Sequence, residues 1–169
     1  MTTTSNSPSS SALIEWAQPE RQAAFHQWLH AQASAHGVMP DTVRPASADA
    51  SFRRYFRVDG PKGSFIVMDA PPDKENCQPF VHVAGLMQAA GLLVPRILDW
   101  DEAQGFMLLD DLGRQTMMEV IDREQPLANL PLYQRATEAL LTWQQASRPD
   151  VLPAYDQALL QRELSLFPD

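Results

Sequence analysis

The most constraining feature of this sequence is the order of β-prone and helical segments between residues 41 and 113, each bounded by turn residues. Asp59-Gly60-Pro61-Lys62-Gly63 separates two β-prone runs as a hairpin connection would, and Gly91 suits the end of a helix. Pro45 lacks an N–H to donate, so the first run suits an edge strand. We expect the order strand, strand, strand, helix, strand, strand, at residues 41–47, 52–58, 64–69, 79–90, 96–100 and 106–109.

Helical patterns flank this strand-bearing region on both sides. Apolar residues recur at helical spacing before it, and everything after Gly113 reads as helical, which predicts an α+β lobe followed by helices. The expected helices lie at residues 19–35, 116–123, 132–147 and 153–167. The expected divisions are a disordered Ser/Thr-rich tail at 1–13, a lobe with a leading helix at 14–113, and the start of a helical lobe at 114–169.

Charge and composition exclude several classes of protein. The chain has 13 basic and 21 acidic residues, a net charge of −8, which argues against broad nucleic-acid binding. Its single cysteine, Cys77, cannot form an intrachain disulfide. The first residues lack the positive start and apolar core of a signal peptide, and no run approaches the about 18 apolar residues of a membrane helix. We therefore expect a cytoplasmic protein without nucleic-acid or membrane partners.

Three stretches of the chain resemble the aminoglycoside phosphotransferase family, which has the kinase-like fold. They lie at residues 49–58, 65–95 and 105–113. Within that family, the chain is similar to bacterial kinases that phosphorylate the anomeric hydroxyl of N-acetylmuramate and N-acetylglucosamine in cell-wall recycling. The runs that carry this similarity are SFRRYFRV, IVMDAPP, GLLVPRIL and LLDDLG. The resemblance implies a five-stranded antiparallel sheet with one helix, followed by the first helices of a helical lobe.

The resemblance also implies an activity, phosphoryl transfer from ATP with Mg²⁺ to a hydroxyl of a small sugar acceptor. In the family, the catalytic loop and the magnesium ligands lie in the helical lobe, beyond the position that corresponds to Asp169. The pattern H-x-D-x-x-x-x-N does not occur in this chain. Because phosphoryl transfer depends on those groups, we expect an N-terminal fragment that is inactive alone and has no catalytic residue or metal ligand of its own. The alternative is a non-catalytic module that binds a nucleotide or a protein.

The acidic connector after the last strand, residues 109–113, carries the family resemblance best. In kinase-like folds, the main chain of this segment contacts the adenine edge, which makes Leu109, Asp110, Asp111 and Leu112 candidate nucleotide-binding residues. We expect the Asp110 C=O and the Leu112 N–H to make the hydrogen bonds, and Leu108 and Leu109 to line the pocket. The alternative is an ordinary linker whose acidic side chains face water.

The small-residue turn before the second strand lies where the family places its phosphate-covering loop. Ser51 belongs to this turn, and Arg53 and Arg54 follow it, so all three are candidate phosphate-binding residues. An arginine offers two parallel donors to a phosphate. Strand alternation places Arg53 on the face of Tyr55 and Arg57, and Arg54 on the opposite face, so only one of the pair can face the nucleotide. The alternative for each is a solvated strand arginine.

The third strand departs from the family pattern. It usually supplies a basic residue for the phosphates, whereas Met68 occupies that position here and Asp69 is expected to add negative charge beside it. The following helix has no Glu to pair with such a base. Either arginine replaces the missing cation, or nucleotide binding is weak.

Overall fold

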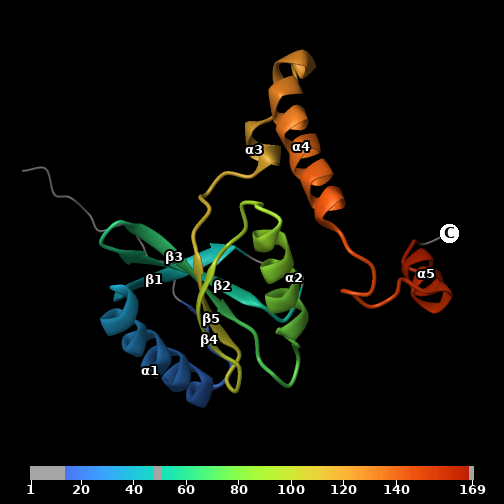
Figure 1. Ribbon diagram of the computed structural model, residues 1–169. Coiled ribbons are helices and arrows are strands. Elements are labelled where there is room, and N and C mark those ends of the chain that lie inside the picture. Colours follow the sequence, from blue (N-terminus) through green and yellow to red (C-terminus); the bar gives the residue numbers. More distant parts are fainter. Residues whose placement is uncertain (1–13, 48–50, 168–169) are drawn as a thin grey trace, which may run out of the picture. The chain divides into compact units, whose positions relative to one another are not determined.

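The computed structural model describes residues 14–47 and 51–167, which divide into two compact units between Val120 and Ile121. The first unit holds the sheet (Figure 1). Its elements are α1 (Pro19–His36), β1 (Met39–Ser47), β2 (Arg54–Gly60), β3 (Gly63–Asp69), α2 (Gln78–Ala89), β4 (Ile97–Asp101), β5 (Phe106–Asp110) and α3 (Met117–Val120). The predicted order of strands and helix is therefore confirmed, as is the α+β class.

The sheet has the strand order β1-β2-β3-β5-β4, and all neighbours pair antiparallel. β1 lies at one edge, as the proline within it predicts, and Pro45 pairs with Phe56 of β2. α2 carries the chain from β3 to the far edge strand, and β5 then returns to pair with β3. Because Phe65 pairs with Asp110, the connector leaves β5 beside the start of β3.

The two faces of the sheet carry separate cores because successive side chains point to opposite sides. One face packs against α1, through a cluster that comprises Phe25, Trp28, Leu29, Val38, Phe56, Val58, Val67, Phe106 and Leu108. The other face packs against α2, through a cluster that comprises Met68, Ala70, Cys77, Met107 and Leu109, with Phe80 and Val81 of the helix. Figure 1 shows α1 and α2 on opposite sides of the strands.

Several predicted bounds differ from the structure. β2 begins at Arg54 rather than at residue 52, because the Phe52 N–H donates to the carboxylate of Glu75, just before α2, 3.2 Å away. Phe52 is 64% exposed and lies outside the cluster that contains Phe56. Only Met117–Val120 of the predicted helix at 116–123 is helical. The predicted tail at 1–13 and residues 48–50 of the predicted turn at 48–51 lie outside the described residues.

The second unit is helical, as the sequence predicts. It contains a 3₁₀ turn at Pro126–Asn129, α4 (Leu130–Ala146) and α5 (Gln157–Leu164). α5 starts later than predicted because the Asp156 carboxylate accepts from the Leu159 N–H, 2.9 Å away, and caps the helix there. Across residues 14–47 and 51–167, no helix is both long enough and apolar enough to cross a lipid bilayer.

Candidate functional site

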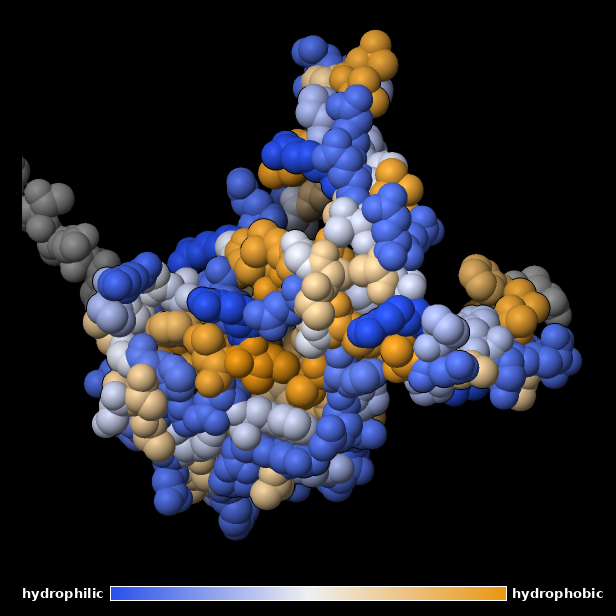
Figure 2. All heavy atoms as spheres, in the orientation of Figure 1, coloured by the Kyte–Doolittle hydropathy of each residue, from blue (hydrophilic) through white to orange (hydrophobic). Residues whose placement is uncertain are grey.

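A cavity of about 440 Å³ lies on the α2 side of the sheet, beside the connector. Its walls come from β1, β2, β3, α2, β5 and the segment after β5, and they comprise Ala46, Ser47, Tyr55, Arg57, Ile66, Phe80, Pro95 and residues 109–116. This volume falls in the range of small-molecule sites. Figure 2 shows hydrophobic residues gathered in a band across the strand-bearing unit, with hydrophilic residues on both sides of it.

The connector is fixed to the sheet by a charged network around Asp111. Arg57 donates to both carboxylate oxygens, from Nε to Oδ2 at 2.5 Å and from Nη2 to Oδ1 at 3.1 Å. Ser64 Oγ donates to Oδ2 at 2.6 Å, and the Gly113 N–H donates to Oδ1 at 2.9 Å. Arg57 Nη2 also donates to the Gly113 carbonyl at 3.0 Å. We call Arg57, Ser64, Asp111 and Gly113 the connector clamp.

The two charged members of the connector clamp, Arg57 and Asp111, are ionised at neutral pH. The hydrogen bonds from Arg57, with those from Ser64 and Gly113, hold the pKa of Asp111 well below its usual range, although partial burial opposes them. The Asp111 hydrogen bond is likewise the largest reason that the pKa of Arg57 is raised. Because the carboxyl pKa is lower in the folded state, the stabilisation is complete above the ordinary carboxyl pKa. It is lost only as the pH falls through the depressed value.

The main-chain groups of Leu112 are not used by the clamp. Across the described residues, neither the N–H nor the C=O of Leu112 makes a hydrogen bond to another protein group. Its neighbour Asp110 is paired, because its N–H donates to the Arg96 carbonyl at 3.1 Å and its carboxylate accepts from Arg96 Nε at 2.5 Å. The Asp111 side chain is only 6% exposed. It therefore does not face water, as it would in an ordinary linker.

The two leucines expected to line the pocket lie on opposite faces. Leu109 contributes to the cavity wall. Leu108 is fully buried in the cluster against α1, so its predicted place in the pocket is wrong. The physical reason is the alternation of side chains along β5, which cannot aim two consecutive residues at one face.

Arg53 lies on the α2 side, next to a second cavity of about 340 Å³ that shares Phe80 and Pro95 with the first. Its Nε donates to Glu75 Oε2 at 3.1 Å, and its N–H donates to Ser51 Oγ at 3.1 Å. Ser51 and Arg53 are thus brought together at the start of β2. Glu75 lies just before α2, so the chain does offer an acidic partner for a cation, although the helix itself carries none.

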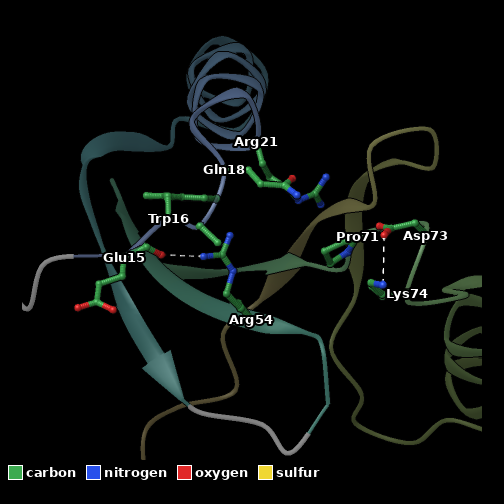
Figure 3. Close-up of a pocket in the computed structure, with 9 residues that line it drawn as sticks. Glu15, Trp16, Gln18, Arg21, Arg54, Pro71, Asp73 and Lys74 are labelled. Carbon is green, nitrogen blue, oxygen red and sulfur yellow. Dashed lines mark hydrogen bonds and ion pairs between the residues drawn. The ribbon is translucent and has the colours of Figure 1, made fainter.

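Arg54 lies on the opposite side of the sheet, as the alternation predicts. Its guanidinium stacks on Trp16, 4.0 Å from the ring centroid, and Nη1 donates to the Glu15 carbonyl at 3.0 Å. It lines a third cavity, of about 580 Å³, together with Arg21 of α1 (Figure 3). The structure therefore does not bring Arg54 together with the connector or with Arg53.

Asp69 does not face the α2 side, so the expectation that it adds negative charge beside Met68 is wrong. Its side chain is fully buried on the α1 side, where Arg21 Nε donates to Oδ1 at 2.9 Å and Arg54 Nε donates to Oδ2 at 3.0 Å. A carboxylate between two guanidinium groups is well compensated. Met68 is itself fully buried in the cluster against α2, so β3 presents no cation to the two cavities on the α2 side.

Reasoning from the sequence missed the residues that fix the connector. The sequence did contain an indication for Arg57, because strand alternation places it on the same face as Arg53 and Tyr55. Nothing in the sequence indicated Ser64, since a serine that begins a strand is commonplace.

Of the described residues, no three His, Cys, Asp or Glu side chains are grouped so that they could hold a metal ion.

Comparison with known proteins gives the family of the chain. Residues 42–169 match the model of the Phosphotransferase enzyme family. An N-acetylmuramate/N-acetylglucosamine kinase of Pseudomonas aeruginosa is 54% identical over 132 residues, which cover 78% of this chain and 38% of that protein. Proteins of the same name from Pseudomonas putida and Neisseria meningitidis are 42% and 43% identical, over 89% of this chain and 47% and 44% of their own lengths. The chain spans less than half the length of these relatives. It belongs to the phosphotransferase enzyme family, of which it carries the strand-bearing lobe and several helices.

Proposed function

We propose that this chain is the nucleotide-binding part of an ATP-dependent phosphotransferase whose acceptor is a hydroxyl of an amino sugar, N-acetylmuramate or N-acetylglucosamine. The acceptor is taken from the names of the relatives. The observation that carries the proposal is the clamped connector, which leaves the Leu112 main chain unpaired beside an apolar cavity. The chain binds nucleotide but does not transfer phosphoryl alone, because it has no H-x-D-x-x-x-x-N pattern.

The base of the nucleotide occupies the 440 Å³ cavity in this proposal. Ile66 and Leu109 give it apolar contacts, and the Leu112 N–H and the Asp110 C=O contact its polar edge. A flat heteroaromatic ring suits such a site because it combines apolar faces with hydrogen-bonding atoms at its rim. The side chains of Asp110 and Asp111 are engaged by Arg96 and Arg57, so we assign base recognition to main-chain groups.

The phosphates lie toward Arg53 and Ser51 in this proposal. Arg53 is preferred to Arg54 because it lies on the α2 side, next to the cavity that adjoins the base site. Glu75 accepts from Arg53 Nε, and Tyr55 is a second side-chain partner of the guanidinium, whose remaining N–H groups contact the anion in this proposal. A divalent cation accompanies ATP in kinases, and we assign it no ligand among the described residues.

Calorimetric titration of adenosine and of Mg·ATP into the 169-residue chain tests this proposal. Arg53→Ala is expected to weaken Mg·ATP binding about tenfold or more and to leave adenosine binding unchanged, since it removes charge-assisted hydrogen bonds. Arg54→Ala is the matched control, one residue away on the other face. It is expected to leave both affinities unchanged in chains that circular dichroism shows to be folded, because Arg54 also pairs with the buried Asp69. No binding of Mg·ATP at millimolar concentration, or a larger loss in Arg54→Ala, would contradict the proposal.

A non-catalytic nucleotide- or protein-binding module is the second candidate. The buried Met68 favours it, because β3 offers no cation to the phosphates. The same titration separates the two candidates. A module that does not hold the phosphates binds adenosine and Mg·ATP equally, whereas the phosphotransferase lobe binds Mg·ATP more tightly.

A further inference from the structure

We propose that Arg57, Ser64 and Asp111 are positioning residues, which hold the connector's main chain in the orientation that a nucleotide base requires. The inference rests on the proposed function. Arg57 and Asp111 also line the cavity, but the hydrogen bonds of all three side chains hold the connector in place. The pairing of β3 with β5 ends at Phe65 and Asp110, so the sheet's own ladder does not hold the residues that follow.

The Asp111 carboxylate has no capacity left for a ligand. It accepts two hydrogen bonds from Arg57, one from Ser64 and one from the Gly113 N–H. An ionised carboxylate offers about four lone-pair sites. Asp111 is 6% exposed and Arg57 is 11% exposed, so both groups are largely withdrawn from solvent. The Asp111 carboxylate, together with Nε and Nη2 of Arg57, is therefore used to hold the connector.

The network holds the chain on both sides of Leu112. Asp111 is fixed through its side chain, while Gly113 is fixed through its N–H to Asp111 and its C=O to Arg57. Gly113 has φ +113°, a conformation that favours glycine and that turns the chain here. Leu112 lies between these two anchors with neither main-chain group used by the protein. The clamp therefore presents the Leu112 main chain in one fixed direction.

A fixed connector favours binding because the ligand does not have to order it. Each residue that a ligand must immobilise subtracts from affinity, and an orientation already held by the protein removes that cost. The strands that supply the donors are far from Asp111 in the sequence, 54 residues for Arg57 and 47 for Ser64. The orientation of the connector thus depends on the folded sheet.

The test measures adenosine affinity by calorimetry, together with hydrogen exchange of the Gly113 amide. Asp111→Asn is expected to weaken adenosine binding about tenfold and to speed exchange at Gly113, because the Arg57 ion pair is lost. Ser64→Ala removes one of the four hydrogen bonds to Asp111, so it serves as a milder variant with a several-fold loss. The ratio of Mg·ATP to adenosine affinity is expected to stay unchanged in both variants, since the phosphate end is untouched.

Arg96→Gln is the matched control. It breaks the ion pair with Asp110 on the same connector, where Arg96 is 63% exposed, and is expected to leave adenosine affinity unchanged. If folded Asp111→Asn and Ser64→Ala chains bind adenosine as tightly as the wild type, the positioning role is overturned, while the proposal of a nucleotide site stands. Failure of the wild-type chain to bind either adenosine or Mg·ATP would overturn both.

Discussion

Asp69→Asn is expected to lower the free energy of unfolding by about 3 kcal/mol, the low end for breaking a buried ion pair by removing one partner. Asp69 is fully buried, and it bridges Arg21 of α1 and Arg54 of β2. A neutral amide of the same size leaves the two guanidinium groups facing one another without the carboxylate between them. The loss is expected at the low end because the arginines are 18% and 35% exposed, so water partly compensates them.

Urea denaturation at neutral pH measures this difference, and Asp59→Asn is its matched control. Asp59 pairs with Arg44 at the surface, where its side chain is 43% exposed, so the same chemical change is expected to have little effect there. Equal losses in the two variants would show that the Asp69 bridge between α1 and the sheet contributes no more than a surface pair.

Leu112→Pro is expected to weaken both adenosine and Mg·ATP binding by about ten- to a hundredfold. Proline removes the N–H that the proposal assigns to the base, and it leaves the acceptor on the base without its partner. The Leu112 side chain is 53% exposed, so the loss of its apolar atoms is expected to matter little for folding. Calorimetric titration of the two ligands measures the effect.

Leu112→Ala is the control for this substitution, because it shortens the same side chain and retains the N–H. Its affinities are expected to stay within a few-fold of the wild type. Circular dichroism and thermal unfolding check that the proline variant keeps the native sheet. If a folded Leu112→Pro chain binds as tightly as Leu112→Ala, the base does not accept from this main-chain group.

The strand order was predictable because turn residues and alternation are local signals. Gly60 and Gly63 bound the hairpin that joins β2 to β3, and Pro45 marks β1 as an edge strand. Alternation also separated Arg53 from Arg54 correctly, since it depends only on the two-residue period of a strand. The same rule, applied to β5, would have excluded Leu108 from the cavity.

The networks that fix the site were not predictable from local patterns. The direction of Asp69 depends on Arg21, 48 residues away on a helix, and the pairing of Asp111 depends on the register of β3 against β5. Both are non-local contacts, which a pattern of neighbouring residues does not encode. The start of α5 was missed for a different reason, because the Asp156 cap is a local signal that the prediction from apolar spacing did not use.

The most direct measurement of nucleotide binding at the connector is an amide NMR titration of the 15N-labelled chain with Mg·ATP. Saturable shifts are expected at Ile66, Leu109, Leu112 and Gly113, with the largest change at the Leu112 amide as it gains an acceptor. Amides around Trp16 and Arg54, on the other face of the sheet, are expected to stay in place. No shift at millimolar nucleotide, or shifts confined to the cavity around Trp16 and Arg54, would contradict a nucleotide site at the connector.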